Sequence, residues 1–111
     1  MLKIFNRLAD VDIRQLMDVY AESIRIAGER DYPDKSENLQ ILFAEQDLFH
    51  YLQRYYNSQG IILAVWELEG RYAAALRLER YSDGYLITAL ETRLEARGRG
   101  FAKALLLNTR E

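Results

Sequence analysis

The residues best suited to chemistry lie together near the C-terminal end of this sequence, in the segment 94–103, Leu-Glu-Ala-Arg-Gly-Arg-Gly-Phe-Ala-Lys. Two glycines there precede a run of strong helix formers. A helix that begins at a glycine-rich turn directs free backbone N–H groups and the positive end of its dipole to one point, and this geometry binds phosphate. Positive charge at the same point comes from three side chains, Arg97, Arg99 and Lys103. The segment therefore predicts a phosphate-binding turn, with a plain strand-to-helix turn carrying solvated arginines as the alternative.

Two common phosphate motifs do not match this segment. The Walker A motif needs a lysine directly after a glycine and then Ser or Thr, whereas Gly100 is followed by Phe101. The dinucleotide pattern G-x-G-x-x-G, counted from Gly98, has Lys103 at the position of its third glycine. The phosphate site is therefore of another type.

The first half of the chain predicts one strand and two helices. Residues 1–7 alternate loosely between apolar and polar and predict a short edge strand. A first helix is predicted from an N-cap at Asp10 to an end near Gly28, because apolar residues recur with helical spacing between them. Ser36 caps a second predicted helix, which stops at residues 57–60.

The second half predicts three strands and a final helix. The strands are residues 61–66, 72–79 and 85 to about 94, separated by turns at Glu69-Gly70 and Ser82-Asp83-Gly84. Three strands joined by two tight turns form an antiparallel meander, and the first of them has the continuous apolar run of an interior strand. The last helix starts after Gly100 and continues to Glu111. The phosphate turn thus lies where the meander leads into a helix.

Composition limits the class of protein. The chain has 111 residues, 50% of them apolar, which suits a single domain, 1–111. Its net charge of −2 argues against nucleic-acid binding. Residues 90–111 nevertheless carry five basic and three acidic side chains, and this local excess favours a small anionic ligand. The basic side chains of this patch are Arg93, Arg97, Arg99, Lys103 and Arg110.

Missing residue types narrow the chemistry further. The sequence has no cysteine and one histidine, so no metal site is predicted. The longest apolar run, residues 61–66, is far shorter than the roughly 20 residues that cross a bilayer, and no signal-peptide pattern is found at the N-terminus. A cytoplasmic location without a membrane partner is therefore expected.

The segment Arg97-Gly98-Arg99-Gly100-Phe101-Ala102 resembles the R/Q-x-x-G-x-G/A signature of the GNAT acetyltransferases, and residues 90–106 are similar to bacterial members of that family. The predicted order of elements also resembles this family. The resemblance implies an α+β fold of the α/β/α sandwich type, with a short N-terminal strand, two helices, an antiparallel three-strand meander and the signature helix.

The resemblance further implies acetyl-coenzyme A as the acyl donor and an amine of a small molecule or protein as the acceptor. In the family, backbone amides across the signature turn hold the pyrophosphate, which corresponds here to Arg97, Gly98, Arg99, Gly100, Phe101, Ala102 and Lys103. Pantetheine contacts correspond to the backbone of Thr92 and Leu94, although many relatives have proline in place of Leu94.

Acetyl transfer to an amine needs a base for the ammonium, a donor for the oxyanion and an acid for the leaving thiolate. The resemblance makes Glu91 the candidate base, because relatives often keep a carboxylate on the fourth strand. An ion pair between Glu91 and a neighbouring arginine is the alternative. A backbone N–H near Leu90 is the candidate oxyanion donor, and the sequence lacks the segment that carries the tyrosine acid in relatives.

Other side chains have simpler explanations than recognition. Packing in the second helix is predicted for Tyr51, Tyr55 and Tyr56, although this helix often borders the acceptor site in relatives. A solvated acidic connector is predicted for Asp31, Asp34 and Glu37.

The family's domain continues past the signature helix, whereas this sequence stops inside it. We therefore expect the N-terminal part of an acetyltransferase, with the donor site largely present. The open edge of the fourth strand predicts a homodimer. The alternative function is a non-catalytic GNAT-like half-domain that serves as a cofactor-binding or dimerisation module.

Overall fold

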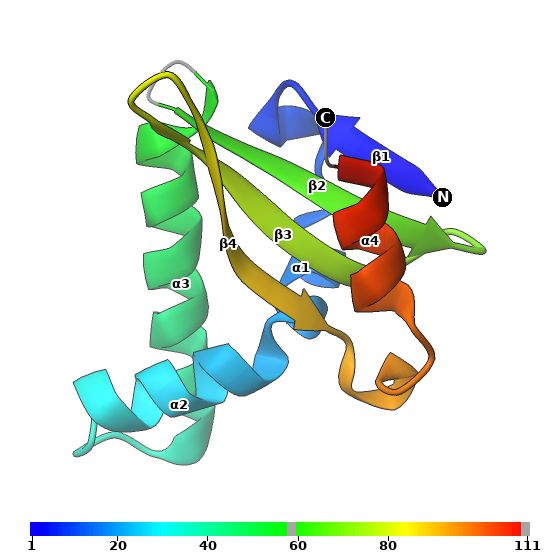
Figure 1. Cartoon of the computed structure of the whole chain (residues 1–111). Helices are drawn as coiled ribbons and strands as arrows, with labels where there is room; N and C mark the ends of the chain where they lie inside the picture. Colours follow the sequence, from blue (N-terminus) through cyan, green and yellow to red (C-terminus); the bar gives the residue numbers. More distant parts are fainter. Residues whose placement is uncertain (58–59, 110–111) are drawn as a thin grey trace.

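A four-stranded antiparallel sheet forms the centre of the computed structural model, which describes residues 1–57 and 60–109 (Figure 1). Its strands are β1 (Leu2–Phe5), β2 (Ile61–Leu68), β3 (Arg71–Tyr81) and β4 (Gly84–Thr92), in the spatial order β1-β2-β3-β4. The predicted edge strand at the N-terminus and the antiparallel meander are therefore confirmed.

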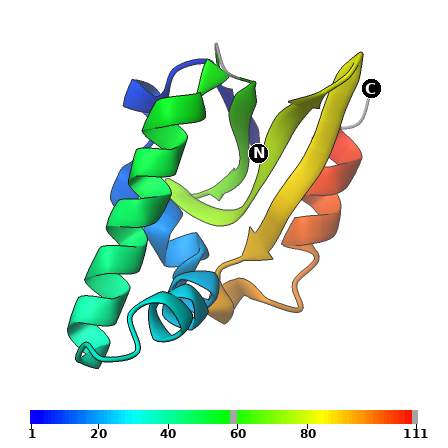
Figure 2. The same cartoon turned by 90° about the vertical axis from the view of Figure 1, so that its left-hand side faces the viewer.

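Helices cover both faces of the sheet. They are α1 (Ile13–Val19), α2 (Ala21–Asp31), α3 (Glu37–Tyr55) and α4 (Phe101–Thr109), and short 3-10 helices span Leu8–Asp10 and Leu94–Ala96. The first three α-helices lie on one face and α4 lies on the other (Figure 2). These layers confirm the predicted α+β sandwich. Arg110 of the predicted basic patch lies outside the described residues.

The first predicted helix is two helices in the structure, and its predicted boundaries are wrong. The N-cap is Asp12 rather than Asp10, and its carboxylate accepts a hydrogen bond from the Gln15 amide at 3.2 Å. Tyr20 separates α1 from α2, with backbone angles of φ −90° and ψ 15° that interrupt the helical geometry. α2 then continues past Gly28, the predicted end.

Gly28 is a packing glycine rather than a helix end. A Cβ at this position would lie 2.6 Å from the backbone oxygen of Gln40, so α2 and α3 approach each other where Gly28 has no side chain. The Gln40 side chain also donates a hydrogen bond to the Tyr32 carbonyl at 3.0 Å beside this crossing. The close crossing fixes α2 relative to α3, and both helices carry residues of the site described below.

The second predicted helix begins as expected. Ser36 caps α3 by accepting a hydrogen bond from the Leu39 amide at 3.4 Å. α3 ends at Tyr55, next to the predicted stop signal, of which residues 58 and 59 lie outside the described residues.

The sheet separates two apolar cores. Leu63 and Val65 of β2 pack under α1, α2 and α3, whereas Ala64 between them packs under α4. All three side chains are fully buried, which confirms β2 as an interior strand covered on both faces. α4 is held against its face of the sheet by Leu105, which is also fully buried.

β4 contains a β-bulge that the sequence did not predict. Ala75 of β3 pairs with Glu91, but Arg77 pairs with Thr88, so β4 has one extra residue between these pairs. Ala89 lies in this interval with φ 52°, an uncommon angle for a residue with a Cβ. Ala89 and Glu91, two residues apart, both lie on the face of the sheet that α1, α2 and α3 cover.

Candidate active site

The turn before α4 has a geometry that suits an anion. Gly98 and Gly100 have φ of 80° and 81°, in the left-handed region that favours glycine, and no atom lies within 4 Å of a Cβ built on either. The Ala104 amide donates to the Gly100 carbonyl at 2.9 Å at the start of α4. The amides that precede Ala104 in this first turn have no carbonyl partner within the helix. These amides and the open space over the glycines form a cradle with the features of an anion site.

The Arg97 side chain connects this turn to two other elements. Its Nη1 pairs with Glu22 Oε2 of α2 at 3.0 Å, and its Nε donates to the Thr92 carbonyl at 3.3 Å. One side chain therefore joins the turn to α2 and to the end of β4, which holds the cradle in a fixed place relative to both.

The other residues of the predicted basic patch differ in exposure. Arg93 is 8% exposed, and its Nε donates to the Tyr72 carbonyl at 3.0 Å, so it supports the sheet. Arg99 is exposed, with its guanidinium carbon 5.0 Å from the centre of the Phe101 ring, and Lys103 is exposed on α4. Neither Arg99 nor Lys103 forms an ion pair within residues 1–57 and 60–109, so their charge is available to an anion at the turn.

The strand before the turn is shorter than predicted. Leu94 lies in the 3-10 helix Leu94–Ala96 and is 68% exposed, so the prediction that it extends β4 is wrong. The Ala96 amide donates a hydrogen bond to the Arg93 carbonyl at 2.9 Å. The backbone therefore forms a 3-10 turn here instead of continuing as a strand. Thr92, the last residue of β4, still pairs with Ala74 of β3.

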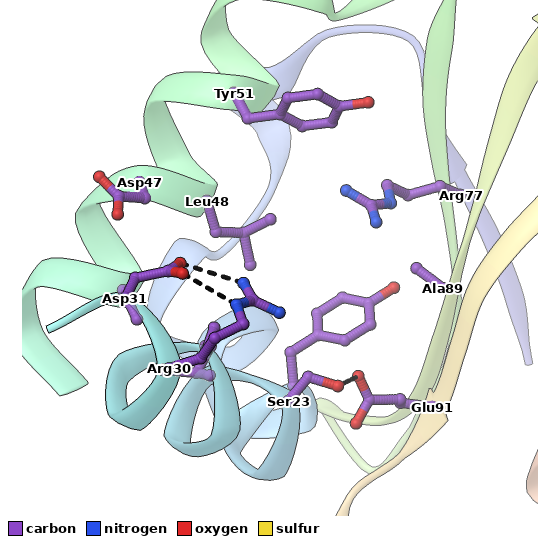
Figure 3. Close-up of a pocket in the computed structure, with 13 residues that line it drawn as sticks. Ser23, Arg30, Asp31, Asp47, Leu48, Tyr51, Arg77, Ala89 and Glu91 are labelled. Atoms are coloured by element: carbon purple, nitrogen blue, oxygen red, sulfur yellow. Dashed lines mark hydrogen bonds and ion pairs between the residues drawn. The ribbon is translucent and has the colours of Figure 1, made fainter. Parts of the chain in front are cut away.

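A pocket of about 570 Å³ lies between α2, α3 and the strands β3 and β4 (Figure 3). Its polar lining consists of Tyr20, Ser23, Arg30, Asp31, Asp47, Tyr51, Arg77 and Glu91. Its apolar lining consists of Ile24, Ala27, Ala44, Leu48 and Ala89. An apolar pocket with a few convergent polar groups is the common form of a small-molecule site.

Glu91 lies at one end of this pocket, beside α2. The Ser23 hydroxyl donates a hydrogen bond to its Oε2. No arginine forms an ion pair with Glu91 in the part of the chain that the structure describes, so the ion pair considered from the sequence is not found. A carboxylate held by one hydroxyl keeps further lone pairs for an amine.

α2 contacts both the turn and the pocket. Glu22 and Ser23 are adjacent residues of this helix, and they contact Arg97 of the turn and Glu91 of the pocket respectively. The candidate base and the turn are therefore linked through one helix.

Two buried groups of the pocket have no partner. Tyr20 is 4% exposed, and neither its hydroxyl nor the Nε of Arg77 has a hydrogen-bond partner in the described chain. Burial raises the pKa of Tyr20, so the phenol stays protonated and can donate a hydrogen bond. Neither residue was predicted, because Tyr20 follows the apolar spacing of a helix and Arg77 follows the alternation of a strand.

The remaining polar side chains of the pocket are paired. Arg30 donates from Nε and Nη2 to the two carboxylate oxygens of Asp31, at 2.8 and 3.0 Å. Asp47 accepts a hydrogen bond from the Tyr32 hydroxyl at 2.6 Å. Tyr51 and Asp31, which the sequence assigned to packing and to a solvated connector, both line the pocket.

Solved structures with the same arrangement of elements are acetyltransferases. A PaiA N-acetyltransferase from Thermoplasma acidophilum, in complex with coenzyme A, matches with a TM-score of 0.58 and 16% identity, covering 97% of this chain and 69% of that one. A GNAT family acetyltransferase from Staphylococcus aureus matches with a TM-score of 0.62 and 20% identity, covering 98% and 73%. The chain has the GNAT acetyltransferase fold. An aminoglycoside acetyltransferase from an uncultured soil metagenomic sample, in complex with sisomicin, shares this GNAT fold with a TM-score of 0.53, 19% identity and coverage of 97% and 66%.

The GNAT fold rests on this structural likeness, because no protein-family model and no curated protein sequence matches the chain. Over residues 1–57 and 60–109, no helix is both long enough and apolar enough to cross a bilayer. The same residues contain no group of three or more His, Cys, Asp or Glu side chains placed to hold a metal ion.

Proposed function

We propose that this chain is an acetyl-coenzyme A-dependent N-acetyltransferase, or the donor-binding part of one. The observation that carries the proposal is that one helix, α2, contacts both a glycine turn suited to an anion and a carboxylate-bearing pocket, through Glu22 with Arg97 and Ser23 with Glu91. The cradle suits the pyrophosphate of coenzyme A, and the pocket suits an amine. The GNAT fold supports the proposal, since neighbours with this fold are crystallised with coenzyme A and with sisomicin.

Acetyl-coenzyme A supplies an acetyl thioester when bound, and residues of this chain hold it. The amides of residues 98–103 donate to the pyrophosphate oxygens, and Arg99 and Lys103 add charge-assisted hydrogen bonds. Arg97 keeps the turn in place through its pair with Glu22. Backbone contacts with the pantetheine arm are proposed for Thr92, at the end of β4, and for Leu94, at the start of the following 3-10 helix.

Glu91 is the base that takes a proton from the ammonium group of the acceptor. Ser23 orients its carboxylate through the hydrogen bond to Oε2. Ala89 and Leu90 have no partner in the register with β3, so the bulge leaves the Leu90 amide as the candidate donor to the acetyl oxygen.

Calorimetric titration with acetyl-coenzyme A tests the donor site. We expect wild-type protein to bind and Gly100→Glu to lose binding, because the substitution puts bulk and negative charge into the open space over the turn. Gly84→Glu is the matched control, since it puts the same charge into open space on the β3–β4 turn, at the opposite end of β4. Unchanged affinity in Gly100→Glu would contradict the assignment.

A thiol-release assay against a panel of amines separates the enzyme from a second candidate function. That second function is a non-catalytic module that binds coenzyme A or assembles with another chain, and the edge of β4 that is unpaired within the described residues favours it. Amine-dependent release supports acetyl transfer, whereas binding without release for every amine supports the module.

We also propose that the chain forms a homodimer through β4. Within the described residues β4 pairs only with β3, which leaves its other edge open. An open edge presents unpaired N–H and C=O groups to a second strand. The cytoplasmic location expected from the sequence stays a prediction.

A further inference from the structure

The pocket between α2, α3, β3 and β4 holds an arginine without a close partner. The Nε of Arg77 is buried without a hydrogen bond in the described chain, and its nearest carboxylate oxygen, on Glu79, is 3.9 Å away. Its guanidinium carbon lies 5.4 Å from the centre of the Tyr51 ring. A buried donor without an acceptor costs free energy, so a ligand that offered an acceptor to this Nε would gain from the contact.

The other charges of the pocket do not supply it. Figure 3 shows Arg77 and Arg30 directed into the pocket from opposite sides, with Glu91 at one end. Arg30 is already paired with Asp31, and the Asp47 carboxylate is directed away from Arg77. A ligand that carries a carboxylate would complete the pairing of Arg77.

The placement of Arg77 and Glu91 indicates the charges of the ligand. Glu91 pairs with Ala75, two residues before Arg77 on β3, and the side chains of Arg77 and Glu91 both line the pocket. A ligand in this pocket therefore meets an acceptor for an ammonium group at Glu91 and a donor to a carboxylate at Arg77.

Resting on the acetyltransferase function proposed above, we infer that the acceptor is a small amino-carboxylate such as a free α-amino acid. Glu91 receives its ammonium group, and Arg77 binds its carboxylate with the planar fork of the guanidinium. The Tyr20 hydroxyl, buried and without a partner, donates to the same carboxylate.

A polycationic acceptor fits this pocket less well. A second ammonium group that extended from Glu91 toward Arg77 would meet its guanidinium, and like charges brought together disfavour binding. Arg30 adds no such repulsion, because Asp31 pairs with it. At the Arg77 side, the pocket therefore favours a carboxylate over a second ammonium group.

Binding to matched compounds tests the inference on the chain itself. The probes are the twenty L-amino acids, each compared with its carboxamide and with the amine that lacks the carboxylate, and spermidine represents polycations. Calorimetry is done with and without saturating coenzyme A. We expect at least one amino acid to bind at least tenfold more tightly than both of its partners. Equal binding of the amine or carboxamide, preference for spermidine, or no binding by any amino acid would each overturn the inference.

Variants of Arg77 test whether this residue causes the preference for a carboxylate. We expect Arg77→Met to weaken amino-acid binding roughly tenfold or more and to leave the binding of the matched amines unchanged. Arg77→Lys keeps the positive charge but lacks the parallel N–H donors of the guanidinium. Its loss of amino-acid affinity is therefore expected to be smaller than that of Arg77→Met. Arg80→Met is the control, because Arg80 is an exposed arginine of the same strand whose guanidinium lies 6.0 Å from the Tyr85 ring. Amino-acid binding that is unchanged in Arg77→Met would contradict the role of Arg77.

The two proposals fail separately. An amino acid that binds through Arg77 while acetyl-coenzyme A does not bind would contradict the acetyltransferase but leave the ligand of the pocket in place. Binding of acetyl-coenzyme A that is lost in Gly100→Glu, together with amines that bind without regard to a carboxylate, would contradict only the amino-carboxylate.

Discussion

Tyr20 places a hydroxyl in the interior, without a partner among residues 1–57 and 60–109, and its ionisation makes the stability of the fold sensitive to alkaline pH. Burial raises the pKa of Tyr20 above its ordinary value of 10.0. As the pH rises through about 10, the unfolded chain loses this proton while the folded chain keeps it. The free energy of unfolding therefore falls above pH 10, by at most about 1.4 kcal/mol per pH unit for this one proton, and the contribution is fully present below pH 10.

We predict that Tyr20→Phe flattens this dependence. Urea unfolding at pH 8 and at several values between 10 and 11.5 measures it, and the variant should lose less stability over that range than the wild type. At pH 8 the variant should be as stable as the wild type or slightly more so, because it removes an unpaired buried hydroxyl. A residual slope is expected, since burial also raises the pKa of Tyr56 and of Tyr72. An unchanged slope would show that Tyr20 ionises in the folded state.

Glu91 is the residue whose chemistry acetyl transfer requires. Glu91→Gln keeps the shape of the side chain and its hydrogen bond from Ser23, but it removes the proton acceptor. We predict a fall in amine-dependent thiol release of about 10²–10⁴-fold. Glu29→Gln, at an exposed carboxylate of α2 that pairs with Arg25, is the control and should leave this rate unchanged. Thiol release by Glu91→Gln at the wild-type rate would remove Glu91 from the mechanism.

At the scale of elements, the crossing of α2 and α3 depends on one missing side chain. Gly28→Ala places a Cβ 2.6 Å from the Gln40 carbonyl oxygen, and backbone cannot yield as a flexible side chain would. We predict a loss of about 1–3 kcal/mol in the free energy of unfolding, measured by urea titration. Gly84→Ala, at a glycine with nothing within 4 Å of the added Cβ, should change stability little. Equal stability of the two variants would mean that α2 and α3 separate without cost.

The elements themselves were predictable where the signal is local. Glycine-containing turns and the apolar run after Gly60 define the meander, and Ser36 defines the start of α3, because these signals act over a few residues. The break at Tyr20 and the bulge at Ala89 were not predictable. Both depend on how the chain packs over the sheet, and neither position has a glycine or proline that would indicate an irregular backbone.

The candidate site likewise has a part that the sequence predicted and a part that it did not. The turn from Arg97 to Lys103 was predictable because its residues are consecutive. The pocket was not, because Tyr20 and Arg77 come from a helix boundary and a strand that only the folded sheet brings together. Glu91 was found through resemblance alone, and its partner Ser23, distant in sequence, had no signal of its own.

At the scale of the whole molecule, the two candidate sites, the glycine turn and the pocket, are formed by helices on opposite faces of the sheet. α4 covers one face and presents its N-terminal turn at the end of β4, while α2 and α3 cover the other face and enclose the pocket (Figures 1 and 2). Arg97 joins these halves by reaching from the turn to Glu22 of α2. The open edge of β4 then remains as the surface along which two such molecules can extend one sheet.

We predict that the chain associates with increasing concentration and that a charge on the open edge prevents it. Tyr85 and Leu86, near the start of β4, are 50% and 54% exposed, so apolar side chains flank the unpaired backbone. Leu86→Lys should shift sedimentation toward the monomer mass, because a lysine on an edge strand disfavours pairing with another strand. Ile26→Lys, at an equally exposed apolar residue of α2, should not, since it leaves the edge unchanged. A strictly monomeric mass for the wild type at high concentration would contradict the dimer, and equal dissociation of both variants would assign association to general hydrophobic contact instead of strand pairing.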